Sequence, residues 1–247
     1  GRVSMFIGPH DVIAWAKAHP EEVCVVAAVG FETTAPVYAL LLREAENAGL
    51  QNVRLVSALK TMFEPLKFLA RAENNIDAFL CPGHVSVLTG SEAFRPLAEE
   101  FQKPFVIAGF EPTDILKAVS EILDQLEAGA PRMANLYPRA VTPEGNRPAM
   151  EAVASYFEPV SARWRGIGEI PGSGLKLRKK YEAFDGWPGA LPRGVESRAC
   201  RCGDVMLGRL LPPECPLFKR GCDPSHPVGA CMVSSEGSCG IWAREAE

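Results

Sequence analysis

The chain has 247 residues with a formal net charge of −4, and 47% of its residues are hydrophobic and 23% charged. This composition fits a globular protein with a sizeable core, and the slight acidity argues against a nucleic-acid-binding protein, because phosphate contacts favour a basic surface. No apolar run is long enough to cross a bilayer and the first residues show no signal-peptide pattern, so we expect a cytoplasmic protein that binds neither membrane nor nucleic acid.

Residues 1–130 alternate strand-like and helix-like stretches. We predict strands over residues 3–7, 23–29, 53–58, 78–81 and 105–108, and helices over residues 11–18, 36–46, 65–71 and 115–126. The run 23–29 is apolar and β-branched, as in a strand buried on both faces. The last helix carries one continuous apolar stripe, formed by Ile115, Leu116, Val119, Ile122, Leu123 and Leu126. The alternation predicts an α/β domain built on a parallel sheet with helices on both faces.

Two short motifs lie where predicted strands end, the edge at which such sheets bind ligands. The stretch G-F-E-T-T places Glu32, Thr33 and Thr34 at a helix start, where a carboxylate can accept backbone N–H bonds. The stretch P-G-H-V-S places His84 and Ser86 at another strand end, where an imidazole can carry a proton, bind a metal or serve a structural role. We expect Glu32 and His84 at the same edge of one sheet. A second copy, G-F-E-P-T at 109–113, is explained by turn and cap chemistry.

Residues 131–165 form a connecting segment with a helix predicted over 147–156, and residues 166–247 form a cysteine-rich domain. Its cysteines follow the pattern C-x-C-x12-C-x6-C-x8-C-x7-C, at Cys200, Cys202, Cys215, Cys222, Cys231 and Cys239. The glycines and prolines between them leave no helix or strand period, so we expect shared thiol chemistry to hold the segment. The candidates are disulfides, zinc and an iron–sulfur cluster.

The spacing favours an iron–sulfur cluster and leaves the other two open. Disulfides suit secreted domains, whereas this chain has no secretory pattern. Zinc knuckles usually contain C-x2-C, which the chain lacks. A four-iron cluster takes four cysteines and tolerates irregular loops. Of the two remaining cysteines, Cys24 is interpreted as a small buried hydrophobe. Cys81 lies at a predicted strand end, where packing is favoured over a reactive role.

The motifs together resemble the HypD family of [NiFe]-hydrogenase maturation factors. The resemblance rests on G-F-E-T-T-A-P at 30–36, P-G-H-V-S at 82–86, W-R-G-I-G at 164–168, C-P-L-F at 215–218 and C-M-V-S-S-E-G at 231–237. It covers essentially the whole chain.

The resemblance implies a redox-active assembly scaffold, rather than a conventional turnover enzyme, on which the Fe(CN)2CO unit of a hydrogenase is built. It implies a [4Fe-4S] cluster on Cys200, Cys215, Cys222 and Cys231, with Cys202 and Cys239 as a redox pair that passes electrons to cleft thiols. The iron under assembly is the cargo. The expected partners are a HypC-type small chaperone and a HypE-type cyanide-delivering protein. Glu32, Thr33, Thr34, His84 and Ser86 are expected to act at the cleft.

One departure from the family pattern stands out. The family carries a C-x-x-C motif and a further cysteine upstream of its glutamate motif, and this chain has no C-x-x-C. We therefore expect an N-terminally truncated member, in which residues 131–165 would pack on a missing N-terminal α/β domain. Two alternatives remain: a cluster-dependent thiol–disulfide oxidoreductase and a zinc-binding structural or interaction protein.

Overall fold

The computed structural model describes residues 3–72, 75–187, 189 and 197–245. The chain divides into two compact units, each assembled from segments that are distant in sequence. Unit 1 comprises Gly1–Phe63, Ala78–Val160 and Gly172–Gly189, and unit 2 comprises Glu64–Asp77, Ser161–Pro171 and Ala190–Glu247. Residues 190–196 of the predicted cysteine-rich domain lie outside the described part.

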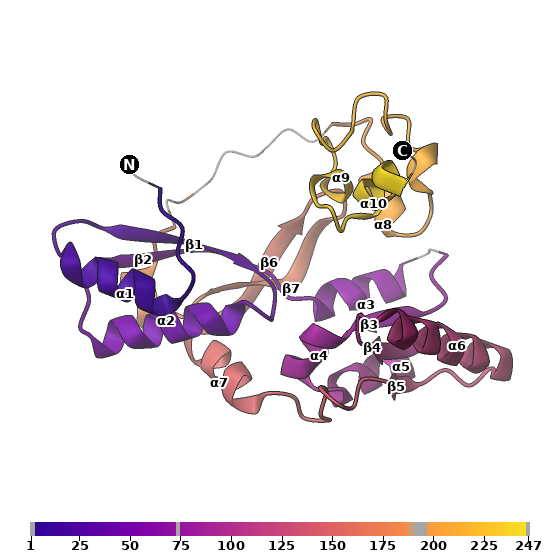
Figure 1. The fold of residues 1–247 in the computed structure, drawn as a ribbon, viewed down its shortest axis with the longest axis horizontal. Helices are drawn as coiled ribbons and strands as arrows, with labels where there is room; N and C mark the ends of the chain where they lie inside the picture. Colours follow the sequence, from indigo (N-terminus) through magenta and orange to yellow (C-terminus); the bar gives the residue numbers. More distant parts are fainter. Residues whose placement is uncertain (1–2, 73–74, 188, 190–196, 246–247) are drawn as a thin grey trace. The chain divides into compact units, whose positions relative to one another are not determined.

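Helices and short strands alternate through the first half of the chain (Figure 1). The strands are β1 (Cys24–Gly30), β2 (Val53–Leu59), β3 (Phe79–Pro82), β4 (Phe105–Ala108), β5 (Met133–Asn135), β6 (Phe157–Trp164) and β7 (Gly168–Leu177). The first seven α-helices are α1 (Pro9–Ala18), α2 (Ala35–Asn47), α3 (Phe63–Arg71), α4 (Gly83–Thr89), α5 (Arg95–Phe101), α6 (Pro112–Ala128) and α7 (Arg147–Tyr156). The remaining helices are η1 (Glu92–Phe94), η2 (Lys179–Phe184), α8 (Cys202–Met206), η3 (Pro212–Glu214), α9 (Ala230–Val233) and α10 (Ser238–Glu245).

The predicted elements between residues 11 and 126 are confirmed within a few residues, as is the helix over 147–156. The predicted strand over residues 3–7 is wrong, because residues 3–6 have no regular structure and pair with no described strand. No helix in the described part of the chain is long and apolar enough to cross a membrane.

The protein is mixed α/β, but its parallel strands form two sheets instead of the predicted one. In the first sheet β1 pairs with β2 from Cys24↔Val53 to Gly30↔Leu59. The second sheet has the order β3-β4-β5, and all its pairs are parallel. The sheets stay separate because β2 does not pair with β3. Instead, Leu55 of β2 forms an isolated bridge with Asp185, and Lys60, just after β2, forms one with Gly174.

The two sheets differ in how much of each face is covered. On β1 the buried residues Val26 and Ala28 alternate with Val25 and Val29, which are 59% and 64% exposed. The expectation that this strand is buried on both faces is therefore wrong. By contrast, all four residues of β4 are buried, as expected for a central parallel strand.

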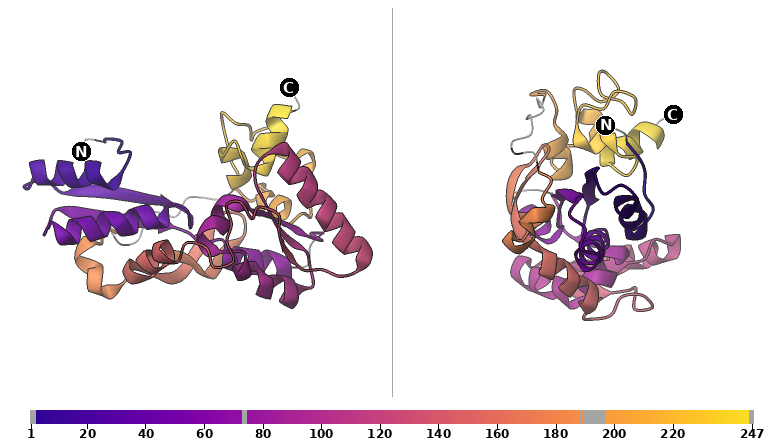
Figure 2. Two further views of the ribbon diagram at one scale, coloured as in Figure 1. Left: turned by 60° about the horizontal axis from the view of Figure 1, so that its bottom comes forward. Right: turned by 90° about the vertical axis from the view of Figure 1, so that its left-hand side faces the viewer.

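The buried side of α6 is small and largely polar. Its buried residues are Asp114, Ala118 and Gln125. Asp114 accepts two hydrogen bonds from Arg139, and Gln125 accepts one from the backbone N–H of Arg132 at 2.8 Å. Because these polar groups are paired, they can face inward at little cost. The predicted apolar stripe does form along α6 (Figure 2), but most of its residues are exposed.

Candidate metal centre

The cysteine segment of unit 2 folds into short helices and turns around a core made largely of sulfur. Cys202 begins α8, Cys231 lies in α9 and Cys239 lies in α10. These three thiols and Cys222 are at most 7% exposed, and they pack with Met232 and other apolar side chains. Cys200 and Cys215 are half-buried. The sequence prediction that sulfur organises this segment therefore agrees with its packing.

Four of the thiols form a continuous series of hydrogen bonds. Cys200 donates to Cys202, and Cys202 donates to Cys231. Cys231 Sγ in turn donates to Cys239 Sγ at 3.1 Å. The other two cysteines are also close, because Cys215 interacts electrostatically with both Cys200 and Cys239, and Cys222 with Cys239. All six sulfur atoms thus share one neighbourhood, and all carry free thiols.

Burial and hydrogen bonds between thiols raise the pKa values of several of these cysteines. It raises the pKa of Cys200 to about 11, although the backbone N–H of Cys202 opposes the rise. The hydrogen bond to Cys231 raises the pKa of Cys202, and burial adds to that rise. Burial also raises the pKa of Cys239. Since metals bind thiolates, any metal that binds here must displace these protons.

The backbone approaches two of the sulfur atoms closely through glycines. Gly166 has φ +81°, and a Cβ there would lie 2.4 Å from Cys202 Sγ. A Cβ on Gly229 would lie 2.6 Å from Cys200 Sγ. Larger residues at either position would collide with the thiols. The W-R-G and V-G-A stretches that carry these glycines therefore shape the cysteine cluster.

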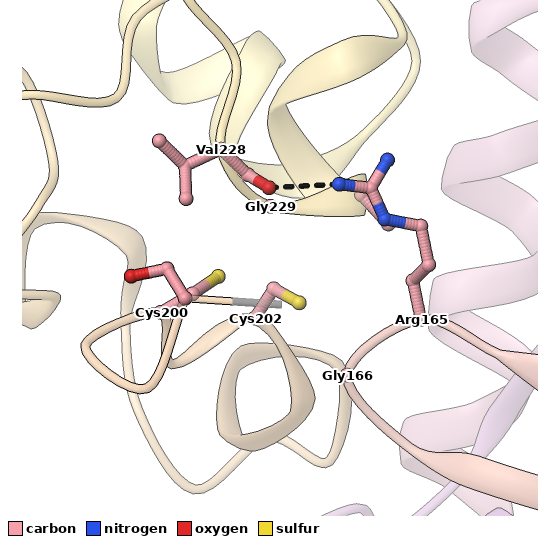
Figure 3. Close-up of a pocket in the computed structure, with 8 residues that line it drawn as sticks. Arg165, Gly166, Cys200, Cys202, Val228 and Gly229 are labelled. Atoms are coloured by element: carbon pink, nitrogen blue, oxygen red, sulfur yellow. Dashed lines mark hydrogen bonds between the residues drawn. The ribbon is translucent and has the colours of Figure 1, made fainter. Parts of the chain in front are cut away.

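A cavity of about 30 Å³ lies between the two cysteines of C-x-C and the loop at Val228 and Gly229 (Figure 3). Arg165 lines the same cavity, and its Nη2 donates to the carbonyl oxygen of Val228 at 2.9 Å. A larger cavity of about 350 Å³ includes Cys200, Asp204 and Arg209 in its lining. The sequence analysis did not single out Arg165, although W-R-G was part of the resemblance.

The donor chemistry of this cluster suits iron and sulfide. Thiolates are soft ligands that hold iron–sulfur clusters and zinc. Within the described residues no three Cys, His, Asp or Glu side chains stand as a ready-made site for a metal ion. The four thiolates of a four-iron cluster bind four different iron atoms, so they lie farther apart than the ligands of a single metal ion. Six clustered thiols offer the four ligands and leave two over.

Glu32 is the buried acid of the first strand-end motif, in unit 1. It is 6% exposed, its Oε1 accepts the backbone N–H of Met62 at 2.6 Å, and its Oε2 has no hydrogen-bond partner. Burial raises the pKa of Glu32, while the N–H groups of Met62 and of Glu32 itself oppose the rise. An acid that is buried and only half satisfied is costly, and such groups concentrate at functional sites.

The turn that carries Glu32 depends on Gly30, whose φ is +140° and whose added Cβ would lie 1.9 Å from Thr34 Oγ1. Thr34 is the N-cap residue of α2, but its hydroxyl donates to the carbonyl oxygen of Phe31 at 3.0 Å instead of capping the helix. Thr33 beside it is half-buried. The glycine and threonine therefore fix the turn, and only Glu32 keeps an unpaired buried oxygen.

His84 and Ser86 have different surroundings. His84 is exposed, and its ring lies 5.2 Å from the ring of Phe110. Ser86 is fully buried, and its hydroxyl donates to the carbonyl oxygen of Pro82 at 3.0 Å. The expectation that Glu32 and His84 share the edge of one sheet is wrong, because β1 and β3 belong to different sheets. Phe110, the aromatic neighbour of His84, was not predicted as a site residue.

The two cysteines outside the cluster are packing residues. Burial raises the pKa of Cys81 far above its ordinary range and also raises that of Cys24. Cys81 is 2% exposed and lies mid-strand in β3. A buried thiol without a nearby cation is unreactive, so Cys81 agrees with its interpretation as a small buried hydrophobe. Cys24 is only half-buried, although it packs against the core.

The fold and the cysteine core define a mixed α/β protein with a separate unit organised by six thiols. A family model described as "HypD: Hydrogenase formation hypA family" matches residues 1–246, and the chain belongs to this family. It is 39% identical to "Hydrogenase maturation factor HypD" of Rhodobacter capsulatus, over 99% of this chain and 69% of that protein. It is 37% identical to the protein of the same name from Escherichia coli, over 97% of this chain and 66% of that protein. A "Putative hydrogenase expression/formation protein" of Methanocaldococcus jannaschii is 38% identical over 94% of this chain and 66% of its own length. The chain thus spans about two thirds of the length of these curated relatives.

Proposed function

We propose that this chain acts in [NiFe]-hydrogenase maturation, as an iron–sulfur scaffold on which the Fe(CN)2CO unit is assembled. The observation that carries the proposal is a core in which four buried cysteines pack with a fifth, half-buried one, in a chain of the HypD family. The relatives named hydrogenase maturation factors support the same conclusion. The protein then works as an assembly scaffold, and the iron being decorated is its cargo.

The resident cofactor in this proposal is a [4Fe-4S] cluster held by Cys200, Cys215, Cys222 and Cys231. When bound, such a cluster supplies one-electron transfer to nearby groups. The chain's own residues prepare the site in two ways. Apolar packing shields the buried sulfur atoms from water, and Arg165 lines the cavity beside Cys200 and Cys202.

The remaining two thiols form the proposed redox pair, Cys202 with Cys239. Closing a disulfide between two thiols releases two electrons and two protons, and opening it consumes them. Cys231 Sγ lies 3.1 Å from Cys239 Sγ, so Cys231 with Cys239 is a second possible pair. In that case Cys202 replaces Cys231 as the fourth cluster ligand. Tryptic mapping of the oxidised protein by mass spectrometry distinguishes the two pairings.

The cleft residues of the proposal are Glu32 and His84, with Thr33, Thr34 and Ser86 shaping their surroundings. Glu32, buried with one unpaired oxygen, can hold or release a proton near a bound ligand. The exposed imidazole of His84 can exchange protons with groups that approach from outside. The proposed partners are a HypC-type small chaperone and a HypE-type cyanide-delivering protein.

The proposal is tested in a host whose own HypD is deleted. The gene that encodes this chain is expected to restore hydrogenase activity. The protein purified without oxygen is expected to show infrared bands of iron-bound CN and CO. A protein that carries a cluster but shows no such bands and restores no activity would instead be a thiol–disulfide oxidoreductase. A protein that carries only zinc would be a structural or interaction protein.

A further inference from the structure

The turn between β6 and β7 packs against the cysteine cluster and carries Arg165. Trp164 ends β6, and its carbonyl oxygen accepts the backbone N–H of Ile167 at 3.1 Å. Gly166 in the same turn has φ +81°, and a Cβ there would lie 2.4 Å from Cys202 Sγ. From this position the side chain of Arg165 reaches across the cavity to a second loop (Figure 3). The proposed function gives Arg165 no task beyond lining that cavity.

That second loop, residues 228–230, directs backbone N–H groups at two sulfur atoms. The N–H of Val228 donates to Cys222 Sγ at 3.3 Å. The N–H of Ala230 donates to the sulfur of Cys202. Bonds of this kind stabilise negative charge on sulfur, because the N–H dipole points its positive end at the sulfur atom. The loop therefore contacts one of the proposed cluster ligands and one of the proposed redox thiols.

The loop comes this close to the sulfur atoms because its middle residue is glycine. A Cβ on Gly229 would lie 2.6 Å from Cys200 Sγ and 3.0 Å from Cys202 Cβ. Glycine is also the least restricted residue, so the loop needs a contact that fixes it in place. Arg165 supplies that contact, because its Nη2 donates to the carbonyl oxygen of Val228 at 2.9 Å. One guanidinium thus connects the β6–β7 turn to the loop that donates to the sulfurs.

We propose that Arg165 is a positioning residue for the cysteine cluster, because its bond to Val228 holds residues 228–230 where their N–H groups donate to sulfur. The inference rests on the proposed function, in which Cys222 is a ligand of a four-iron cluster. Hydrogen bonds to the sulfur ligands raise the reduction potential of such a cluster, because reduction adds negative charge. Cys222 is a ligand with either pairing of the remaining thiols, so this effect does not depend on which pair forms a disulfide.

Hydrogen exchange of the purified chain, followed by mass spectrometry, tests the positioning whatever metal the chain holds. Arg165→Met keeps an unbranched side chain but removes the donors. Without the bond to Val228, the amides of residues 228–230 should exchange about two- to tenfold faster, which corresponds to the loss of one hydrogen bond. Arg165→Lys should restore slow exchange, because its ammonium can donate to the same carbonyl. The amides of α6 report on global unfolding and should keep their rates. Unchanged exchange in Arg165→Met overturns the proposal.

A redox titration followed by electron paramagnetic resonance tests the consequence for the cluster. Arg165→Met should lower the midpoint potential, and Arg165→Lys should restore it. Arg198→Met is the matched control, because it removes the same charge from an exposed residue two positions before Cys200 and leaves the bond to Val228 in place. Equal shifts in Arg165→Met and Arg198→Met, or no shift in either, overturn the proposal. A chain that binds no four-iron cluster refutes the proposed function, and the exchange result then decides alone whether Arg165 positions the loop.

Discussion

The half-satisfied carboxyl of Glu32 should make the stability of the protein depend on pH. Burial raises the pKa of Glu32 in the folded protein above its unfolded value. The folded state is therefore favoured while Glu32 is protonated. That contribution is fully present below the unfolded pKa of about 4.3 and is lost as the pH rises through the raised folded pKa.

The substitution Glu32→Gln isolates this effect. The amide keeps an oxygen that can accept the N–H of Met62 and cannot ionise. Each pKa unit by which folding raises the pKa of Glu32 corresponds to about 1.4 kcal/mol of stability that the wild type loses at high pH and the variant keeps. We therefore expect wild type and variant to have similar stability near pH 4, and the variant to be the more stable at pH 8. Urea unfolding followed by circular dichroism at several pH values measures the difference.

The matched control is Glu111→Gln, at the same place in the second G-F-E copy. Glu111 is exposed as the N-cap residue of α6. Its substitution should change stability by no more than about 0.5 kcal/mol at any pH. If the free energy of unfolding changes with pH in the same way for wild type and Glu32→Gln, the reasoning is refuted. So would a variant that loses stability relative to wild type as the pH rises.

Three further predictions follow from particular contacts. Gly166→Ala should lower the metal content of the purified protein, because the added Cβ would collide with the thiol of Cys202. Gly168→Ala is the control for backbone strain alone, because Gly168 has φ +115° but no atom near an added Cβ. Iron analysis of both variants separates the collision from the strain. His84→Ala should abolish hydrogenase maturation in cells and leave the thermal unfolding midpoint unchanged, because the side chain is exposed; full maturation with the variant would contradict its role. Arg139→Ala should destabilise the protein at neutral pH, because the hydrogen bond from Arg139 lowers the pKa of Asp114 in the folded state. The stabilisation from this ion pair is lost as the pH falls through the lowered pKa of Asp114. A stability difference between wild type and variant that persists at pH 2 would contradict this.

The sequence predicted the secondary structure of residues 11–126 well because its apolar periods are strong. It could not predict how the strands join into sheets. The joining of the strands depends on isolated bridges from Leu55 and Lys60 to Asp185 and Gly174, which lie far later in the chain. It also could not predict which way α6 faces. The buried polar residues of α6 are stabilised by hydrogen bonds from Arg132 and Arg139, which come after the helix in sequence.

The two G-F-E copies show the same limit at the candidate site. Their sequences are alike at Glu32 and Glu111, but one acid is buried and the other exposed. The difference arises because the first carboxyl meets the backbone of Met62 after β2. For the cysteines, the spacing predicted that the thiols gather. The order of contacts between them depends on where α9 and α10 place Cys231 and Cys239, which spacing alone does not determine.

The most direct test of the account is chemical analysis of the chain purified without oxygen. We expect about four iron and four sulfide per chain, with a broad visible absorption that disappears in a Cys215→Ser variant. Electron paramagnetic resonance of the reduced protein should show a single four-iron cluster. One or two zinc ions per chain with no visible absorption, or a chain that binds no metal, would contradict the claim that these thiols hold iron and sulfide.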